Sequence, residues 1–125
     1  GHRVGNHTFN HIQGVVSWSR LYVENVEKAS EYIHSNLFRP PHGHMRFPQL
    51  LRLRKKYKII MWDVVTRDYS WRMTPEDVFN NVKKHARNGS IIVFHDSLKA
   101  EKNMKEAMPR AIEWLLSEGY QFKLL

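Results

Sequence analysis

Residues 57–65 have the sequence YKIIMWDVV, and this stretch decides the fold. It is rich in β-branched and aromatic residues, and Ile59 to Trp62 form a nearly continuous apolar run. A strand that is apolar on both faces is typical of a parallel sheet covered by helices. The stretch therefore predicts a buried strand of a parallel α/β fold.

Other strands are predicted on both sides of this stretch. Residues 91–94, IIVF, form a second buried strand that leads directly into His95, Asp96 and Ser97. Residues 37–39 form a short strand that ends at the pair Pro40-Pro41, because proline lacks a backbone donor. Residues 120–125 are expected to form a closing strand.

Helical segments alternate with these strands. Apolar residues recur at helical spacing over residues 22–33, and Pro48 opens a second helix that runs to about Lys56. Thr74 and Pro75 start a third helix, which ends at residues 88–89. A last helix buries Met108, Ile112, Leu115 and Leu116, with Pro109 in its first turn or at a kink. This alternation favours a parallel α/β architecture, in which functional residues gather at the carboxyl ends of strands.

The composition fits a single domain of 125 residues, with 42% hydrophobic and 26% charged residues. The absence of cysteine excludes disulfides, thiolate metal sites and a cysteine nucleophile, so histidine and carboxylate are the plausible ligands. No apolar run approaches the roughly 20 residues of a membrane span. The chain begins with Gly1 and not with methionine, so we expect an internal fragment or a processed product.

The formal charge of +8 favours acidic partners. Much of this charge lies between Arg46 and Lys58, where we expect the solvated face of a helix. No aromatic residues interleave with these charges, as a surface that stacks on bases requires, so nucleic acid is not expected as a partner.

Four polar signals fall in loops or at strand ends. The first is the pair His7 and His11, whose spacing lets two imidazoles point at one metal ion, although such a pair also arises by chance. The others are residues 39–43 (RPPHG), residues 63–71 (DVVTRDYSW) and His95.

In this order and spacing, the four signals resemble the polysaccharide deacetylases of the nodulation-protein-B homology type, also called carbohydrate esterase family four. The resemblance covers essentially the whole chain and implies an irregular (β/α) barrel. Roughly five strands can be counted from the pattern, whereas even small barrels use about eight. We therefore expect residues 1–125 to be the carboxyl-terminal portion of one catalytic domain, with the first strand or strands missing and an open edge that an oligomer could cover.

The resemblance implies roles for the first two signals. His7 and His11 would supply two ligands of a divalent metal, most often zinc, with Co²⁺, Ni²⁺ or Mn²⁺ as alternatives. Arg39 would orient the catalytic aspartate of the family. Pro41 belongs to the same motif, and His42 stands where an aromatic residue is usual and would offer its backbone N–H to the oxyanion.

The resemblance implies that the remaining signals supply the general acid and contacts with the substrate. His95 corresponds to the general acid of the family, and Asp68 to the carboxylate that orients it. Tyr69 or Trp71 would form the aromatic wall of the substrate groove, and Val93 would line the acetyl pocket.

One family motif, Thr-Phe-Asp-Asp, has no counterpart, because no aspartate precedes Asp63. That motif supplies the general base and the third protein ligand, so we expect weak metal binding and little turnover from this chain alone. The implied substrate is an N-acetylated or O-acetylated polysaccharide, and the implied location is extracytoplasmic or at a bacterial cell envelope. A metal-dependent amidohydrolase of small amides and a non-catalytic glycan-binding pseudoenzyme are the alternatives.

Overall fold

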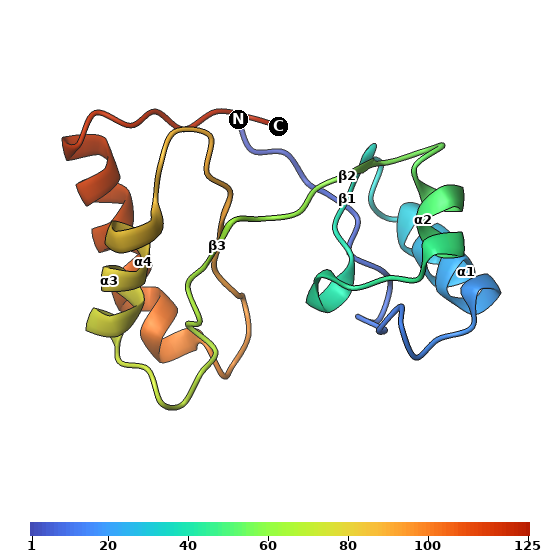
Figure 1. Ribbon diagram of the computed structural model, residues 1–125, viewed down its shortest axis with the longest axis horizontal. Helices are drawn as coiled ribbons and strands as arrows, with labels where there is room; N and C mark the ends of the chain where they lie inside the picture. The colour runs from blue at the N-terminus through green and yellow to red at the C-terminus, as the bar shows by residue number, and fades with distance from the viewer. The chain divides into compact units, whose positions relative to one another are not determined.

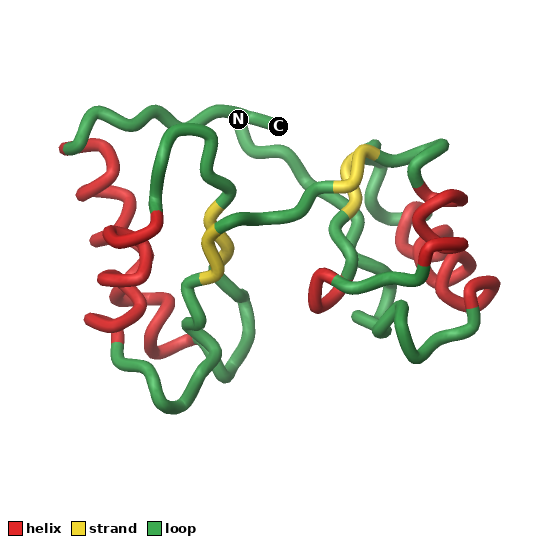
Figure 2. Tube along the Cα trace, in the orientation of Figure 1, coloured by secondary structure: helices red, strands yellow, loops and turns green.

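The computed structural model describes residues 1–125, which divide into two compact units. Unit 1 comprises Gly1–Met61 with Leu124–Leu125, and unit 2 comprises Trp62–Lys123. Each unit combines helices with one pair of short parallel strands, joined by long loops (Figures 1 and 2). The predicted mixed α/β architecture is therefore confirmed. No helix is long and apolar enough to span a membrane.

Unit 1 is built around the parallel pair β1 (Leu37–Phe38) and β2 (Lys58–Ile59). Asn6 lies beside Phe38 in an isolated parallel bridge, so a third segment joins this pair. The helix α1 (Ser19–Ser30) packs on it through residues at helical spacing. The core is formed by Tyr22, Val26, Phe38, Leu53 and Tyr57.

The helix α2 (Phe47–Leu53) packs against α1 and holds the loop before it. The buried Gln49 donates from Nε2 to the Gly14 carbonyl at 2.8 Å, and its Oε1 accepts from the Arg46 backbone N–H at 2.8 Å. A Cβ at Gly14 would lie 2.6 Å from that Oε1, so only glycine fits. The basic residues of the segment 46–58 are all exposed, as expected for a solvated face.

Unit 2 pairs β3 (Val64–Val65) with β4 (Ile92–Val93) in parallel and packs α3 (Pro75–His85) against α4 (Glu101–Ser117). The helix start predicted at Thr74 and Pro75 is confirmed by a capping box: the Thr74 hydroxyl accepts from the Asp77 N–H, and the Asp77 carboxylate accepts from the Thr74 N–H. The core between the two helices is formed by Val82, Ala111 and Leu115.

The single strand predicted over residues 57–65 is wrong, because the structure divides it into β2 and β3. Ile60 still donates to the Phe38 carbonyl, but Asp63 then pairs with Ile91. The Asp63 carboxylate accepts from the Ile91 N–H at 2.9 Å and from the Ser90 hydroxyl at 3.0 Å, which starts a new pair of strands. The apolar run thus serves two sheets.

The predicted closing strand over residues 120–125 is also wrong, because these residues adopt no regular structure. Arg3 donates instead to the Leu125 carbonyl, which fixes the last residues to the start of unit 1.

The last helix, α4, begins at Glu101, so that Pro109 lies in its interior and not in its first turn. It buries the line Asn103, Ala107, Ala111 and Leu115, whereas Ile112 and Leu116 are exposed. Of the predicted apolar residues, only Leu115 lies on this buried face, next to the small alanines.

Candidate functional site

His7 leaves the sheet of unit 1 beside the end of β1. The preceding residue, Asn6, is buried and held in three ways: its backbone pairs with Leu37 and Arg39, its Nδ2 donates to the Val26 carbonyl at 2.9 Å, and its Oδ1 accepts from Thr8. The Val26 carbonyl belongs to α1. The position of His7 is therefore fixed by both the strand pair and the helix.

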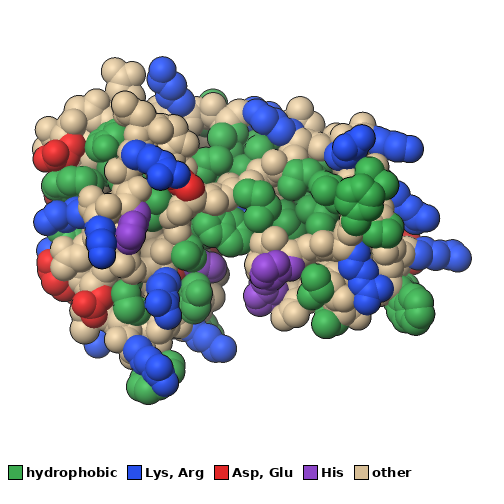
Figure 3. All heavy atoms as spheres, viewed as in Figure 1, with side chains coloured by type: hydrophobic (Ala, Val, Ile, Leu, Met, Phe, Trp, Pro, Cys, Tyr) green, Lys and Arg blue, Asp and Glu red, His purple; other side chains and the backbone are tan.

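The rings of His7 and His11 lie together, as the spacing predicted. Their centroids are 4.9 Å apart, and His11 contacts the ring of His42 at the same distance. Histidine side chains gather at one place on the surface of unit 1 (Figure 3). The segment is a loop in which Thr8 and His11 have positive φ angles of 66° and 59°, a conformation that costs energy in residues other than glycine and is concentrated at functional sites.

Arg39 fixes the orientation of His7. The Nδ1–H of His7 donates to the Arg39 carbonyl at 2.6 Å, so Nδ1 carries the proton and Nε2 points elsewhere. The guanidinium of Arg39 donates to the carbonyls of Ile60 at 3.2 Å and Met61 at 3.5 Å, beyond the end of β2. Arg39 thus links the histidine loop to both strands of unit 1.

His42 and Pro41 lie in the short 3₁₀ turn Pro41–Gly43 that follows β1. Pro41 is buried, whereas His42 is exposed. The backbone of His42 has a φ angle of 56°. Its Nε2 lies 3.4 Å from Nε2 of Gln13. The turn presents the His42 imidazole to the other two histidines, which the sequence resemblance alone did not predict.

In unit 2, a buried carboxylate holds a histidine at two points. Oδ1 of Asp68 lies 2.7 Å from Nδ1 of His95, and Oδ2 accepts from the His95 backbone N–H at 2.7 Å. Asp68 is fully buried, whereas the His95 side chain is 38% exposed. The ring of His95 is therefore oriented by a carboxylate at one nitrogen and accessible elsewhere.

Of the two wall candidates, the structure brings Tyr69 to His95. The ring centroids of Tyr69 and His95 are 4.8 Å apart in an edge-on arrangement. Trp71 is 86% exposed and lies against Arg72. Val93 is buried in β4, two residues before His95, and its carbonyl accepts from the Thr66 hydroxyl at 2.8 Å.

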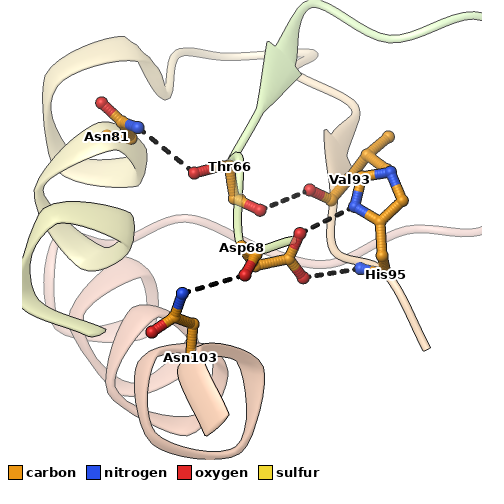
Figure 4. A network of polar contacts seen from close by, with 6 residues as sticks. All are labelled: Thr66, Asp68, Asn81, Val93, His95 and Asn103. Atoms are coloured by element: carbon orange, nitrogen blue, oxygen red, sulfur yellow. Dashed lines mark hydrogen bonds and ion pairs between the residues drawn. The ribbon is translucent and has the colours of Figure 1, made fainter. Parts of the chain in front are cut away.

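Three polar residues around Asp68 were not predicted. Thr66, Asn81 and Asn103 join the backbone of β3, β4 and the loop after β3 into one network of hydrogen bonds (Figure 4). Their partners are backbone carbonyls, which leave no signal in the sequence. Asn103 alone could have been detected from the sequence as a buried polar residue, because it lies on the same face of α4 as Ala107 and Ala111.

The histidines of unit 1 fit two positions in the ligand set of a divalent metal. Burial lowers the pKa of His7, which favours the neutral imidazole that binds metals. The donation from Nδ1 to a carbonyl is the usual support for a histidine ligand and leaves Nε2 for the ion. No group of three or more histidine, cysteine or acidic side chains is placed to hold a metal, so the pair fits as part of a site.

Comparison with known proteins shows which family this chain resembles. A peptidoglycan N-acetylglucosamine deacetylase from Bacillus cereus is 25% identical over 136 residues, covering 98% of this chain and 61% of that protein. A crystal structure of a peptidoglycan N-acetylglucosamine deacetylase matches 100% of this chain and 62% of that chain, with a TM-score of 0.86 and 25% identity. The chain is similar in sequence and in fold to the polysaccharide deacetylases, as the sequence motifs predicted.

Another relative is the chitooligosaccharide deacetylase of Azorhizobium caulinodans. It is 32% identical over 105 residues, covering 77% of this chain and 49% of that protein. The chain thus spans about a quarter to three fifths of the length of the curated relatives that it matches. No sequence profile of a protein family matches it. The predicted resemblance and fold class are confirmed.

Proposed function

We propose that this chain contributes metal-binding and acid–base residues to a polysaccharide deacetylase that removes acetyl groups from N-acetylated sugars. The observation that carries the proposal is the buried Asp68 carboxylate, which holds His95 by ring and backbone after β4, in a chain related to such deacetylases. Polysaccharide O-acetyl groups are the corresponding ester substrates.

The reaction adds water across an amide. The water oxygen bonds to the acetyl carbon, the carbon–nitrogen bond breaks, acetate leaves, and the departing amine takes up a proton. His7 and His11 would hold a divalent metal, with zinc as the first choice and Co²⁺, Ni²⁺ and Mn²⁺ as alternatives. A bound metal of this kind activates water and polarises a carbonyl.

His95 is assigned as the general acid that protonates the leaving amine. Asp68 supports this role, because a buried carboxylate at Nδ1 keeps the ring in one orientation. The backbone N–H of His42 is assigned to the oxyanion, where a preorganised donor lowers the barrier. Arg39 holds the histidine loop, as its contacts with His7, Ile60 and Met61 support.

Substrate contacts are assigned to Pro41, Tyr69, Trp71 and Val93. Tyr69 is favoured over Trp71 as the aromatic wall, because it is the ring that contacts His95. Several relatives are peptidoglycan deacetylases of bacteria, so peptidoglycan is the first substrate to test and the bacterial cell envelope is the proposed location.

Acetate release tests the proposal. The chain is incubated with zinc and either N-acetylated chito-oligosaccharides or peptidoglycan fragments, and acetate is quantified against His95→Ala. The matched control is His85→Ala, which removes an exposed histidine of the same unit. Because the motif that supplies the general base has no counterpart in this chain, we expect slow release, which depends on zinc and on His95 and which the control retains.

Zinc binding is measured separately by calorimetry. Replacement of His7 or His11 by alanine is expected to abolish binding, whereas replacement of the exposed His34 leaves it unchanged. Binding of glycan without acetate release would favour the glycan-binding alternative. Release from small amides but not from glycans would favour the amidohydrolase. Zinc binding that survives the loss of both histidines would refute the assigned metal site.

A further inference from the structure

The side chain of Asn103 joins the two ends of the loop that carries Asp68. Figure 4 shows its contact with Asp68. Asn103 is the third residue of α4 and is only 6% exposed. Its Nδ2 donates to the Asp68 carbonyl at 2.9 Å and to the Met73 carbonyl at 3.1 Å. Both hydrogens of the amide nitrogen are therefore used on one loop.

This loop depends on such support, because it belongs to neither a helix nor a strand. Arg67 has a φ angle of 61°, and two internal turns close at Ser70 and Met73. On the other side of Asp68, the Thr66 carbonyl accepts from Asn81 of α3 at 3.2 Å. Amide side chains from α3 and α4 thus hold the backbone immediately around Asp68.

The backbone position of Asp68 decides where its carboxylate lies. Two side-chain torsions connect the backbone to the oxygens, and both oxygens contact His95 at 2.7 Å. The adjacent Tyr69 packs its ring against His95. A shift of the loop would therefore move the carboxylate and the aromatic contact together, and would release the histidine ring from its orientation.

We propose that Asn103, which lies on α4, is a positioning residue for the Asp68–His95 pair. By holding the loop that carries Asp68, it sets the direction in which Nε2 of His95 points. The catalytic meaning of this role rests on the proposed function, whereas its structural part can be tested without activity. Asn103 acts through the loop backbone and is assigned no contact with substrate.

The test compares Asn103→Leu with the wild-type chain by NMR of ¹⁵N-labelled histidine. Leucine has the same branched shape as asparagine but lacks both donors. In the wild-type chain, we expect a downfield proton resonance from the Nδ1–H of His95 that exchanges slowly with water. In the variant, we expect this resonance to broaden or disappear while the backbone spectrum of α3 and α4 remains folded.

Gln49→Met is the matched control, because Gln49 is another buried amide that donates to two backbone carbonyls, at 2.8 and 3.3 Å. The control is expected to leave the His95 resonance unchanged. A folded Asn103→Leu chain with the wild-type resonance would overturn the inference. If that variant does not fold, Asn103→Ser replaces it, and failure of both to fold would identify Asn103 as a residue required for folding and overturn positioning.

Acetate release provides the second readout. Misplacement of the general acid is expected to lower kcat by about 10- to 100-fold with little change in KM. Absence of release from the wild-type chain would count against the proposed function, and the NMR comparison would still decide the role of Asn103.

Discussion

Replacement of Asp68 by asparagine tests the central contact of unit 2. The carboxylate of Asp68 accepts two hydrogen bonds of 2.7 Å in a position that water does not reach. Asparagine keeps one acceptor oxygen and turns an NH₂ group towards a donor of His95. Either two donors then face each other in a buried site, or the His95 proton moves to Nε2 and Nδ1 becomes the acceptor; in both cases the hydrogen bond to a charged carboxylate is lost.

A hydrogen bond to a charged group contributes about 1.5–3 kcal/mol, and a buried donor without a partner costs a similar amount. Because the two are partly the same loss, we expect Asp68→Asn to lower the free energy of unfolding by about 2–3 kcal/mol. The measurement is a urea titration followed by ¹H–¹⁵N spectra, in which the amide signals of α3 and α4 report unit 2. The Nδ1–H resonance of His95 should disappear from the folded variant.

Asp63→Asn is the control from the same unit. Its carboxylate also accepts a backbone N–H and a second donor, but it is partly exposed and water can replace what is lost. We expect a clearly smaller loss of stability than for Asp68→Asn. Equal losses in the two variants, or an unchanged His95 resonance in Asp68→Asn, would refute the reasoning.

Three further changes test other parts of the structure. Tyr22→Phe removes a buried hydroxyl without a hydrogen-bond partner, and burial raises the pKa of this tyrosine to about 12. Urea titration should therefore show a free energy of unfolding about 1 kcal/mol higher than that of the wild-type chain. A lower free energy of unfolding would contradict this. In the metal-free chain, the NMR titration midpoint of His7 should lie below its ordinary value of 6.5, because burial lowers its pKa. The unfolded chain therefore binds a proton at His7 more readily than the folded chain does. The contribution of His7 to stability is present above pH 6.5 and declines as the pH falls from 6.5 towards the pKa of the folded chain. A titration midpoint above 6.5 would argue against the burial of His7. Thr74→Ala removes the cap of α3 and should cost about 1 kcal/mol by thermal unfolding, whereas Thr74→Ser should retain most of it.

The sequence predicted that the rings of His7 and His11 lie together, because residue type and spacing carry this information. His95 was selected by its residue type and its place after a strand, and its role stays a prediction. What could not be predicted is the support of these residues by backbone atoms. The contact between His7 and the carbonyl of Arg39 leaves no trace in the sequence, because any residue at position 39 has a carbonyl.

The strand pattern shows a similar limit. Apolar content predicted one buried strand over residues 57–65, whereas Met61 is 41% exposed and Asp63 divides the stretch between two sheets. That division depends on the approach of residues 90 and 91, nearly thirty positions away, to one carboxylate. In the last helix, the buried face was predicted from large apolar residues, whereas packing against α3 selected Ala107 and Ala111.

The three-way attachment of Asn6 makes α1 a part of the histidine loop. Asn6 directly precedes His7, and its side-chain amide donates to the Val26 carbonyl of α1. Asn25 of the same helix accepts from the backbone N–H of Phe9. The segment 6–11 and α1 would therefore have to be transplanted together if this loop were grafted onto another protein. For the same reason, substitutions within α1 that change its stability should also change the affinity for zinc, although no residue of that helix is assigned as a ligand.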